Sequence, residues 1–256
     1  MSSDQRILLW DIETAPLLAY VWQAKTEYIG AHQFCHDSFM LSWAAKWHGQ
    51  KKVHGQVLTA DEARQQDDGR IVQGLADMIR QADVIVAHNG DRFDVPMLNN
   101  RLLLLGLEPL QPVKTVDTLK LAKRTLRLAS NKLDYLAQAL GVGQKIKTDF
   151  DLWRDCYQGK VRALREMYRY NRMDVDVLES VFDALRPYAK GLPRLVDAEH
   201  EGEEACPYCG SGDLQRRGVD RTNAGTRQRY QCQGCSRWSR GRSGLVEPRL
   251  ATVPLQ

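Results

Sequence analysis

The sequence predicts an α/β fold in which about 185 residues form five strands with helices on both sides, followed by a small cysteine-rich module. Short apolar runs of strand length alternate with segments whose apolar residues recur at helical spacing. Four of the cysteines form two close pairs after residue 205. A content of 43% hydrophobic and 27% charged residues among 256 is typical of a globular chain with a substantial core.

Four strands are expected in the first part of the chain. Residues 7–10 are a short apolar run, and residues 39–47 and 51–57 are expected to pair as a hairpin. Residues 60–81 place apolar side chains at helical spacing, which predicts one helix, and residues 83–87 form another compact apolar run. The predicted order is therefore strand, strand, strand, helix, strand.

The second part is predicted to be mostly helical. We expect a helix at 95–105, a brief fifth strand at 113–116, helices at 117–122 and 133–140, and a long helix over about 160–185. Gly106 follows the first of these helices, Gly141 is placed to cap the third at its C-terminus, and Pro187 ends the last.

The chain loses its periodicity after Pro187, where proline, glycine and acidic residues predict a linker. The expected organisation is an α/β domain over 1–187, a linker over 188–204, a cysteine module over 205–243 and a tail over 244–256. No apolar run approaches the roughly 20 residues that span a bilayer, and the first residues lead directly into a strand. We therefore expect a cytoplasmic protein with no membrane partner.

Acidic residues follow the predicted strands and recur on the last helix. Asp11 and Glu13 are two apart on a strand, so their side chains point to the same side. Asp94 follows the strand at 83–87, and Asp174 lies one helical turn after Tyr170. Such carboxylates repel one another unless cations join them, and two Mg²⁺ or Mn²⁺ ions would suit their hard oxygens. A clamp of this kind fits phosphodiester hydrolysis by a two-metal-ion mechanism, with Tyr170 orienting the water.

Three motifs in chain order resemble motifs I to III of the DEDD (DnaQ-like) 3′–5′ exonucleases, in the tyrosine subtype, which includes proofreading domains of DNA polymerases. They are Asp11-Ile12-Glu13-Thr14, Asn89 with Phe93-Asp94, and Tyr170 with Asp174. Residues 130–143 are similar to the helix that precedes motif III in family B polymerase exonucleases and their stand-alone relatives. The resemblance covers about residues 6–186.

The resemblance implies a ribonuclease-H-like fold with a mixed five-stranded sheet, and a metal-dependent 3′–5′ exonuclease. It implies that Asp11, Glu13, Asp94 and Asp174 are the ligands of the Mg²⁺ or Mn²⁺ ions. Tyr170 takes the place of the histidine of the other subtype, since residues 89–199 contain no histidine. Thr14, Asn89 and Phe93 match positions that support the site or contact the terminal nucleotide.

Neighbouring polar residues receive structural interpretations. Asp176 points about 200° away from Asp174 around the helix, so it is not counted as a ligand. His88 is expected to be a structural residue at a strand end, and Asp117 to cap a helix.

Other functions stay open. The chain could be a non-catalytic nucleic-acid-binding or recruiting factor on an exonuclease scaffold, or an endonuclease or junction-processing enzyme on the same fold. The polymerase-like resemblance favours DNA over RNA, as a single strand or a 3′ end. Any proofreading would serve a separate polymerase or another replication or repair protein.

The second module is predicted to bind one structural Zn²⁺. Cys206-x-x-Cys209 and Cys232-x-x-Cys235 supply four thiolates at zinc-ribbon spacing, and the module resembles the ribbons at the start of some transposase proteins. Its arginines could grip phosphates, with six positive charges in excess over 206–243. They are Arg216, Arg217, Arg221, Arg227, Arg229, Arg237, Arg240 and Arg242, with Tyr230 and Trp238 among them. The two aromatic residues could stack on bases or fill the small core, and the ribbon could also bind protein.

Overall fold

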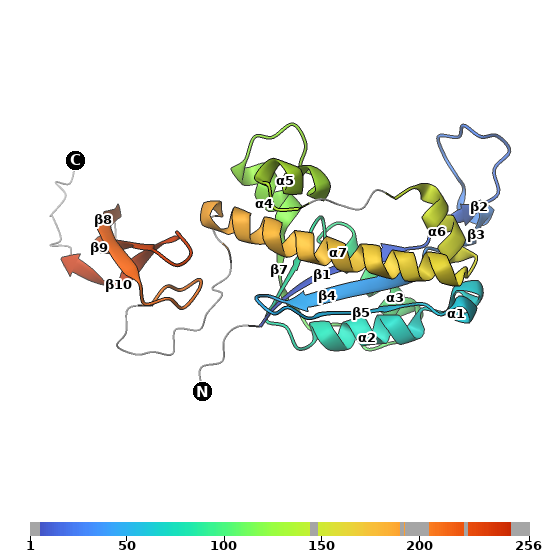
Figure 1. The fold of residues 1–256 in the computed structure, drawn as a ribbon, viewed down its shortest axis with the longest axis horizontal. Coiled ribbons are helices and arrows are strands. Elements are labelled where there is room, and N and C mark those ends of the chain that lie inside the picture. The colour runs from blue at the N-terminus through green and yellow to red at the C-terminus, as the bar shows by residue number, and fades with distance from the viewer. Residues whose placement is uncertain (1–5, 144–147, 190–191, 193–204, 223–224, 247–256) are drawn as a thin grey trace, which may run out of the picture. The chain divides into compact units, whose positions relative to one another are not determined.

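The structure is a computed structural model that describes residues 6–143, 148–189, 192, 205–222 and 225–246. The chain forms two compact units that divide between Ala184 and Leu185 (Figure 1). Most of the expected linker at 188–204 lies outside the described residues, as do residues 247–256 of the expected tail. The start of the tail at residue 244 is wrong, because strand β10 (Trp238–Val246) continues to Val246.

A mixed five-stranded sheet forms the centre of the larger unit. Its strands are β1 (Ile7–Thr14), β4 (Met40–Trp47), β5 (Val53–Val57), β6 (Val84–Ala87) and β7 (Lys114–Asp117). They lie in the order β5-β4-β1-β6-β7, and β1 pairs antiparallel with β4 and parallel with β6. The five predicted strands and the predicted hairpin of β4 with β5 are confirmed.

Alternation along β1 places Trp10 on the face of the sheet opposite to Asp11 and Glu13. Trp10 joins the main buried cluster, which includes residues of α2 (Gly69–Ile79). On β4, Ser42 instead donates a hydrogen bond to Asn171 of the long helix α7 (Val161–Leu185). Because Glu13 pairs with Ser42 across the sheet, Glu13 and Asp11 lie on the α7 face of the sheet.

Helices cover the sheet (Figure 1). Besides α2 and α7, the helices of the larger unit are α1 (Ala60–Gln65), α3 (Asp94–Leu104), α4 (Thr118–Thr125), α5 (Leu133–Leu140) and α6 (Phe150–Tyr157). Two 3₁₀ turns occur at Ala31–Gln33 and, in the smaller unit, at Arg186–Tyr188. The helices predicted at 95–105, 117–122, 133–140 and 160–185 are confirmed within a few residues. Gly141 caps α5 with a φ of 67°, as predicted.

The single helix predicted over 60–81 is wrong, because the chain breaks into α1 and α2 at residues 66–68. Asp68 is completely buried there and accepts two hydrogen bonds from the guanidinium of Arg101 on α3, at 2.7 and 2.8 Å. Asp68 also accepts one from the backbone N–H of Met40, at 2.7 Å. The carboxylate of Asp68 thus joins the start of α2 to α3 and β4. A continuous helix over 60–81 would lose these hydrogen bonds.

Three short elements were not predicted. Strands β2 (Leu18–Ala19) and β3 (Phe34–His36) form a hairpin after β1, and α6 precedes α7. The two strands are only two and three residues long, so they show no periodicity that a sequence could reveal. The hairpin loop leaves Tyr20, Trp22 and Tyr28 exposed.

The smaller unit contains a three-stranded antiparallel sheet in the order β10-β9-β8, with β8 at Leu214–Thr222 and β9 at Gly225–Cys232. Its buried residues include Cys206, Tyr230 and Cys232. Tyr230 therefore fills the small core of this unit, which is one of the two roles expected for it, and is not exposed for stacking on a base. Among the described residues of the whole chain, no helix has both the length and the apolar character needed to cross a membrane.

Candidate active site

Three carboxylates from two distant segments meet at the end of β1. The carboxylate oxygens of Asp11, Glu13 and Asp174 lie within 4.8 Å of one another. Ligand oxygens on opposite sides of one Mg²⁺ lie about 4.2 Å apart, since each is about 2.1 Å from the ion. The spacing fits a shared cation, and oxygen ligands suit Mg²⁺ or Mn²⁺.

The three acids line a cavity of about 440 Å³, a volume typical of ligand pockets. The remaining lining residues are His88, Asn89, Leu119, Lys132, Leu133 and Asp134. Asn89 thus lies where a substrate contact is expected. Thr14 and Phe93 are not among the described residues that line this cavity, although Phe93 is exposed.

Asp94 lies beside the cluster, at the start of α3. Its Oδ1 accepts a hydrogen bond from the backbone N–H of Ile12 at 3.3 Å, so this carboxylate lies next to the strand segment between Asp11 and Glu13. Burial raises the pKa of Asp94 to about 7; the N–H of Ile12 opposes this shift and the charge of Asp117 adds to it. A cation beside Asp94 would favour its ionised form.

Asn171 orients Asp11 from the neighbouring helix. Its Nδ2 donates to Asp11 Oδ2 at 2.6 Å, and its Oδ1 accepts from the hydroxyl of Ser42 at 3.2 Å. Asn171 is completely buried, so both contacts are held by packing. In the sequence, the position of Asn171 directly after Tyr170 is the one signal that points to it.

Tyr170 lies one helical turn before Asp174 on α7 and is 5% exposed. Its ring contacts that of Trp153 on α6 edge to face, with centroids 5.9 Å apart and planes at 77°. The indole Nε1 of Trp153 donates to Glu13 Oε2 at 3.2 Å. Trp153, which lies outside the three sequence motifs, therefore contacts both the tyrosine and a candidate metal ligand.

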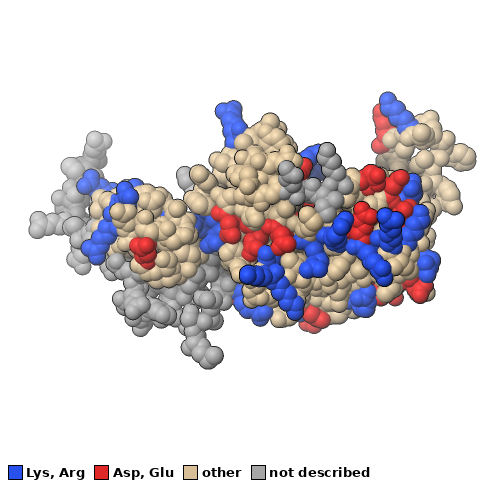
Figure 2. All heavy atoms as spheres, in the orientation of Figure 1, with Lys and Arg blue, Asp and Glu red and all other residues tan. Residues whose placement is uncertain are grey.

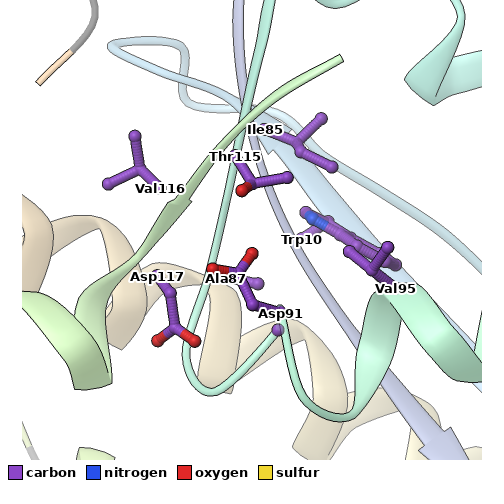
Figure 3. A pocket seen from close by; sticks show the side chains of 9 residues that line it. Trp10, Ile85, Ala87, Asp91, Val95, Thr115, Val116 and Asp117 are labelled. Atoms are coloured by element: carbon purple, nitrogen blue, oxygen red, sulfur yellow. The ribbon is translucent and has the colours of Figure 1, made fainter. Parts of the chain in front are cut away.

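Asp117 supports the other side of the site. Figure 3 shows it at the end of β7, near Ala87 at the end of β6 and Asp91 in the turn that follows. Its Oδ1 accepts from the backbone N–H of Leu119, which confirms the predicted helix cap, and from that of Asn89 at 3.0 Å. Asn89 has a left-handed φ of 69°, a conformation that asparagine tolerates better than most residues. The cap thus also fixes the turn that presents Asn89.

Asp176 and Glu179, which follow Asp174 on α7, belong to a different surface. Asp176 Oδ1 lies 2.7 Å from Lys46 Nζ, and Glu179 Oε2 lies 2.6 Å from the same atom. Asp176 is therefore engaged with β4, in line with its exclusion from the predicted ligands. His88, through Nδ1, lies 2.9 Å from the hydroxyl of Thr118, which fits its expected structural role.

Four cysteine thiols cluster in the smaller unit. Sγ atoms of Cys206 and Cys235 lie 3.6 Å apart, those of Cys209 and Cys232 lie 3.5 Å apart, and all four lie within 4.8 Å of one another. None forms a disulfide. A tetrahedral zinc site with bonds of about 2.3 Å places its sulfurs about 3.8 Å apart. The cluster is thus compatible with a zinc ribbon.

The arginines of this unit divide by exposure. Arg216, Arg217, Arg221, Arg229 and Arg240 are exposed, Arg227 is half-buried, and the side chain of Arg242 lies outside the described part of the structure. Arg229 lies 4.6 Å from the ring centroid of Trp238, which is 44% exposed. Figure 2 shows basic side chains on the visible face of this unit.

The expectation that Arg237 contacts phosphate is wrong. Arg237 is 2% exposed, its Nη2 donates to the carbonyl of Ala189 at 2.7 Å, and its guanidinium lies 3.9 Å over the ring of Tyr208. Burial lowers the pKa of Arg237. The side chain holds the unit together instead of facing a ligand.

The sheet order, the flanking helices and the acidic cavity define a protein of ribonuclease-H-like fold. Residues 35–186 match the family model of the RNase H superfamily. Because this match covers more than half of the chain, the protein belongs to that superfamily. Membership supports nuclease activity and nucleic-acid binding in general.

A solved structure shares the fold. The family B DNA polymerase from the hyperthermophilic archaeon Pyrobaculum calidifontis is similar with a TM-score of 0.54 and 19% sequence identity. The match covers 72% of this chain and 25% of the polymerase, so the chain spans about a quarter of that protein. No curated protein sequence matches the chain.

Proposed function

We propose that this protein is a metal-dependent 3′–5′ exonuclease of the tyrosine DEDD subtype that acts on nucleic-acid strands, with DNA preferred over RNA. The observation that carries the proposal is the meeting of Asp11, Glu13 and Asp174 within 4.8 Å in a 440 Å³ cavity, with Tyr170 one helical turn from Asp174. Superfamily membership supports the nuclease class.

The donor set suits divalent cations. Asp11, Glu13, Asp94 and Asp174 would hold Mg²⁺ or Mn²⁺, which supply Lewis-acid activation of water and neutralise charge on the phosphate. Asn171 fixes the orientation of the Asp11 carboxylate. The hydroxyl of Tyr170 would orient the attacking water, and Asn89 would contact the terminal nucleotide from the cavity wall.

The C-terminal unit completes the proposal as a zinc ribbon that binds the same strand. Cys206, Cys209, Cys232 and Cys235 would hold one structural Zn²⁺, since their spacing fits that ion. Exposed Arg216, Arg217 and Arg229, with half-buried Arg227, would contact backbone phosphates. A separate polymerase or repair protein is the proposed partner if the exonuclease proofreads.

The test uses DNA and RNA strands labelled at the 3′ or the 5′ end, with Mg²⁺ or Mn²⁺. We expect stepwise shortening from the 3′ end that ceases with a chelator. Asp11→Asn and Asp174→Asn should lower the rate by more than about 100-fold, since even changes outside the ligand set often cost 10- to 100-fold.

Asp176→Asn is the matched control, because Asp176 lies on the same helix but pairs with Lys46. It should leave the rate unchanged. Binding without metal-dependent shortening would favour the non-catalytic scaffold, and cutting of circular strands would favour an endonuclease.

A further inference from the structure

We infer that Trp153 is a positioning residue that sets both the orientation of the Glu13 carboxylate and the place of the Tyr170 ring. The inference rests on the proposed function, because it assigns Glu13 to a metal and Tyr170 to the attacking water. It concerns a residue of α6, which lies outside the three acidic motifs.

The hydrogen bond from Trp153 has a definite chemical consequence. An indole N–H donates and has no acceptor, so it engages one carboxylate oxygen and cannot itself bind a cation. Trp153 Nε1 donates to Glu13 Oε2 at 3.2 Å, which restricts rotation of that carboxylate. Groups that orient a metal ligand in this way typically change metal affinity or activity by 10- to 100-fold.

The second contact reaches Tyr170. The rings of Trp153 and Tyr170 meet edge to face at 5.9 Å, within the range of favourable aromatic pairs. A single side chain therefore connects two groups from different elements, Glu13 on β1 and Tyr170 on α7. Movement of the indole would disturb both groups together.

A purely packing role is the alternative for this tryptophan. Trp10 and Trp43 show what such a role looks like here, because each buries its indole Nε1 without a hydrogen-bond partner among the described residues. Trp153 differs, since it is only partly buried and its N–H meets a carboxylate of the cavity. Leu152 and Cys156 are the buried residues that anchor α6.

The test separates the two contacts with two variants. Trp153→Phe keeps an aromatic ring near Tyr170 but removes the N–H, and Trp153→Leu removes both. Mn²⁺ binding is measured by electron paramagnetic resonance on the full chain without nucleic acid, together with kcat, KM and thermal stability. We expect Mn²⁺ affinity to fall about 10- to 100-fold in both variants, with a further loss of kcat in Trp153→Leu alone.

Tyr157→Phe is the matched control one turn along α6. Tyr157 accepts a hydrogen bond from Gln66 Nε2 at 2.9 Å and contacts Phe39 instead of the cavity. Its variant should keep wild-type Mn²⁺ affinity and kcat. If Trp153→Phe does not fold, Trp153→Met takes its place in the binding assay, because methionine fills irregular space.

The outcomes distinguish this inference from the proposed function. If Asp174→Asn lowers Mn²⁺ affinity and folded Trp153→Phe does not, the positioning role is overturned and the metal site stands. If neither variant lowers Mn²⁺ affinity, the proposed metal site itself fails. A loss of thermal stability in Trp153→Phe with unchanged Mn²⁺ affinity and kcat would assign Trp153 to packing alone.

Discussion

Lys132 is the one basic residue among the described residues that line the acidic cavity, apart from the titratable ring of His88. It is exposed at the start of α5, where its ammonium group can reach a phosphate that enters the cavity. A strand brings negative charge towards at least three carboxylates, so a cationic side chain at this position reduces repulsion. We therefore expect Lys132 to contribute to substrate binding.

We predict that Lys132→Met raises KM about tenfold and leaves kcat within about twofold, because one charge-assisted contact is worth roughly 1.5–3 kcal/mol and tenfold corresponds to 1.4 kcal/mol. The slope of log(kcat/KM) against log salt should become shallower by about 0.7, the value for one phosphate contact on a single strand. Steady-state rates at several salt concentrations check both values.

Lys123→Met is the control for this prediction, since Lys123 is exposed on α4 and does not line the cavity. A fall in kcat without a change in KM would contradict a binding role for Lys132 and place it in the chemical step.

The candidate ligands could be found from the sequence, but the residues that orient them could not. Local periodicity places Asp11 and Glu13 on one strand face, and Tyr170 and Asp174 on one helix face. The order of the three motifs, by their resemblance to the DEDD exonucleases, joins these segments and Asp94 into one predicted site. Asn171 and Trp153 act through contacts with residues 160 and 140 positions away in the chain. No local pattern encodes such contacts, because they depend on how α6 and α7 pack on the sheet.

At the level of elements, the carboxylate of Glu62 joins α1 to α2. Glu62 accepts hydrogen bonds from the backbone N–H of Thr59, in a capping box, and from Arg70 Nε and Nη2 on α2, each at 2.7 Å. The guanidinium of Arg70 and these hydrogen bonds lower the pKa of Glu62 to about 2. The sequence predicted one continuous helix across this junction, because its apolar spacing continues through it. In the structure, contacts of Glu62 and Asp68 stabilise a break between the two helices.

We predict that Glu62→Gln lowers the free energy of unfolding by about 2 kcal/mol at pH 7, as expected for hydrogen bonds to a charged group. A carboxyl whose pKa is lower in the folded state stabilises the fold above its unfolded pKa, and this contribution is lost as pH falls through its folded pKa. The difference between variant and wild type should therefore shrink between about pH 4.5 and pH 2. Urea unfolding at several pH values measures it.

Asp61→Asn is the comparison for Glu62→Gln, because Asp61 lies on the same helix in an exposed pair with Arg64. Exposed pairs contribute little, so its stability should match that of the wild type throughout. A Glu62→Gln difference that stays constant down to pH 2 would contradict the assigned ionisation.

On the scale of the whole molecule, the two units have different sources of stability. The larger unit buries apolar residues on both faces of its sheet, such as Trp10 in the main cluster on the α2 face and Leu9, next to it in β1, on the opposite face. The smaller unit buries few residues, and chains of its size seldom fold without a metal or disulfides. The spacing of the cysteines in the sequence was sufficient to predict their cluster. The burial of Arg237 could not be predicted in this way, because it results from tertiary contacts with Tyr208 and Ala189.

We predict that removing zinc unfolds the smaller unit and leaves the larger unit folded, because a cation bound by the four thiols would join both cysteine pairs. Zinc is removed by a zinc-selective chelator with Mg²⁺ kept in excess, or by Cys232→Ser. Binding and degradation of long strands should weaken, since the exposed arginines lose their framework, while the rate on short oligonucleotides should stay within about twofold of the wild type. Metal analysis should find one zinc per chain before chelation. Circular dichroism then measures the loss of structure in the smaller unit, and rates on short and long substrates measure the effect on activity. Equal loss of activity on both substrate lengths would mean that the ribbon contributes to the active site itself, and unchanged binding of long strands would remove the arginine surface from nucleic-acid recognition.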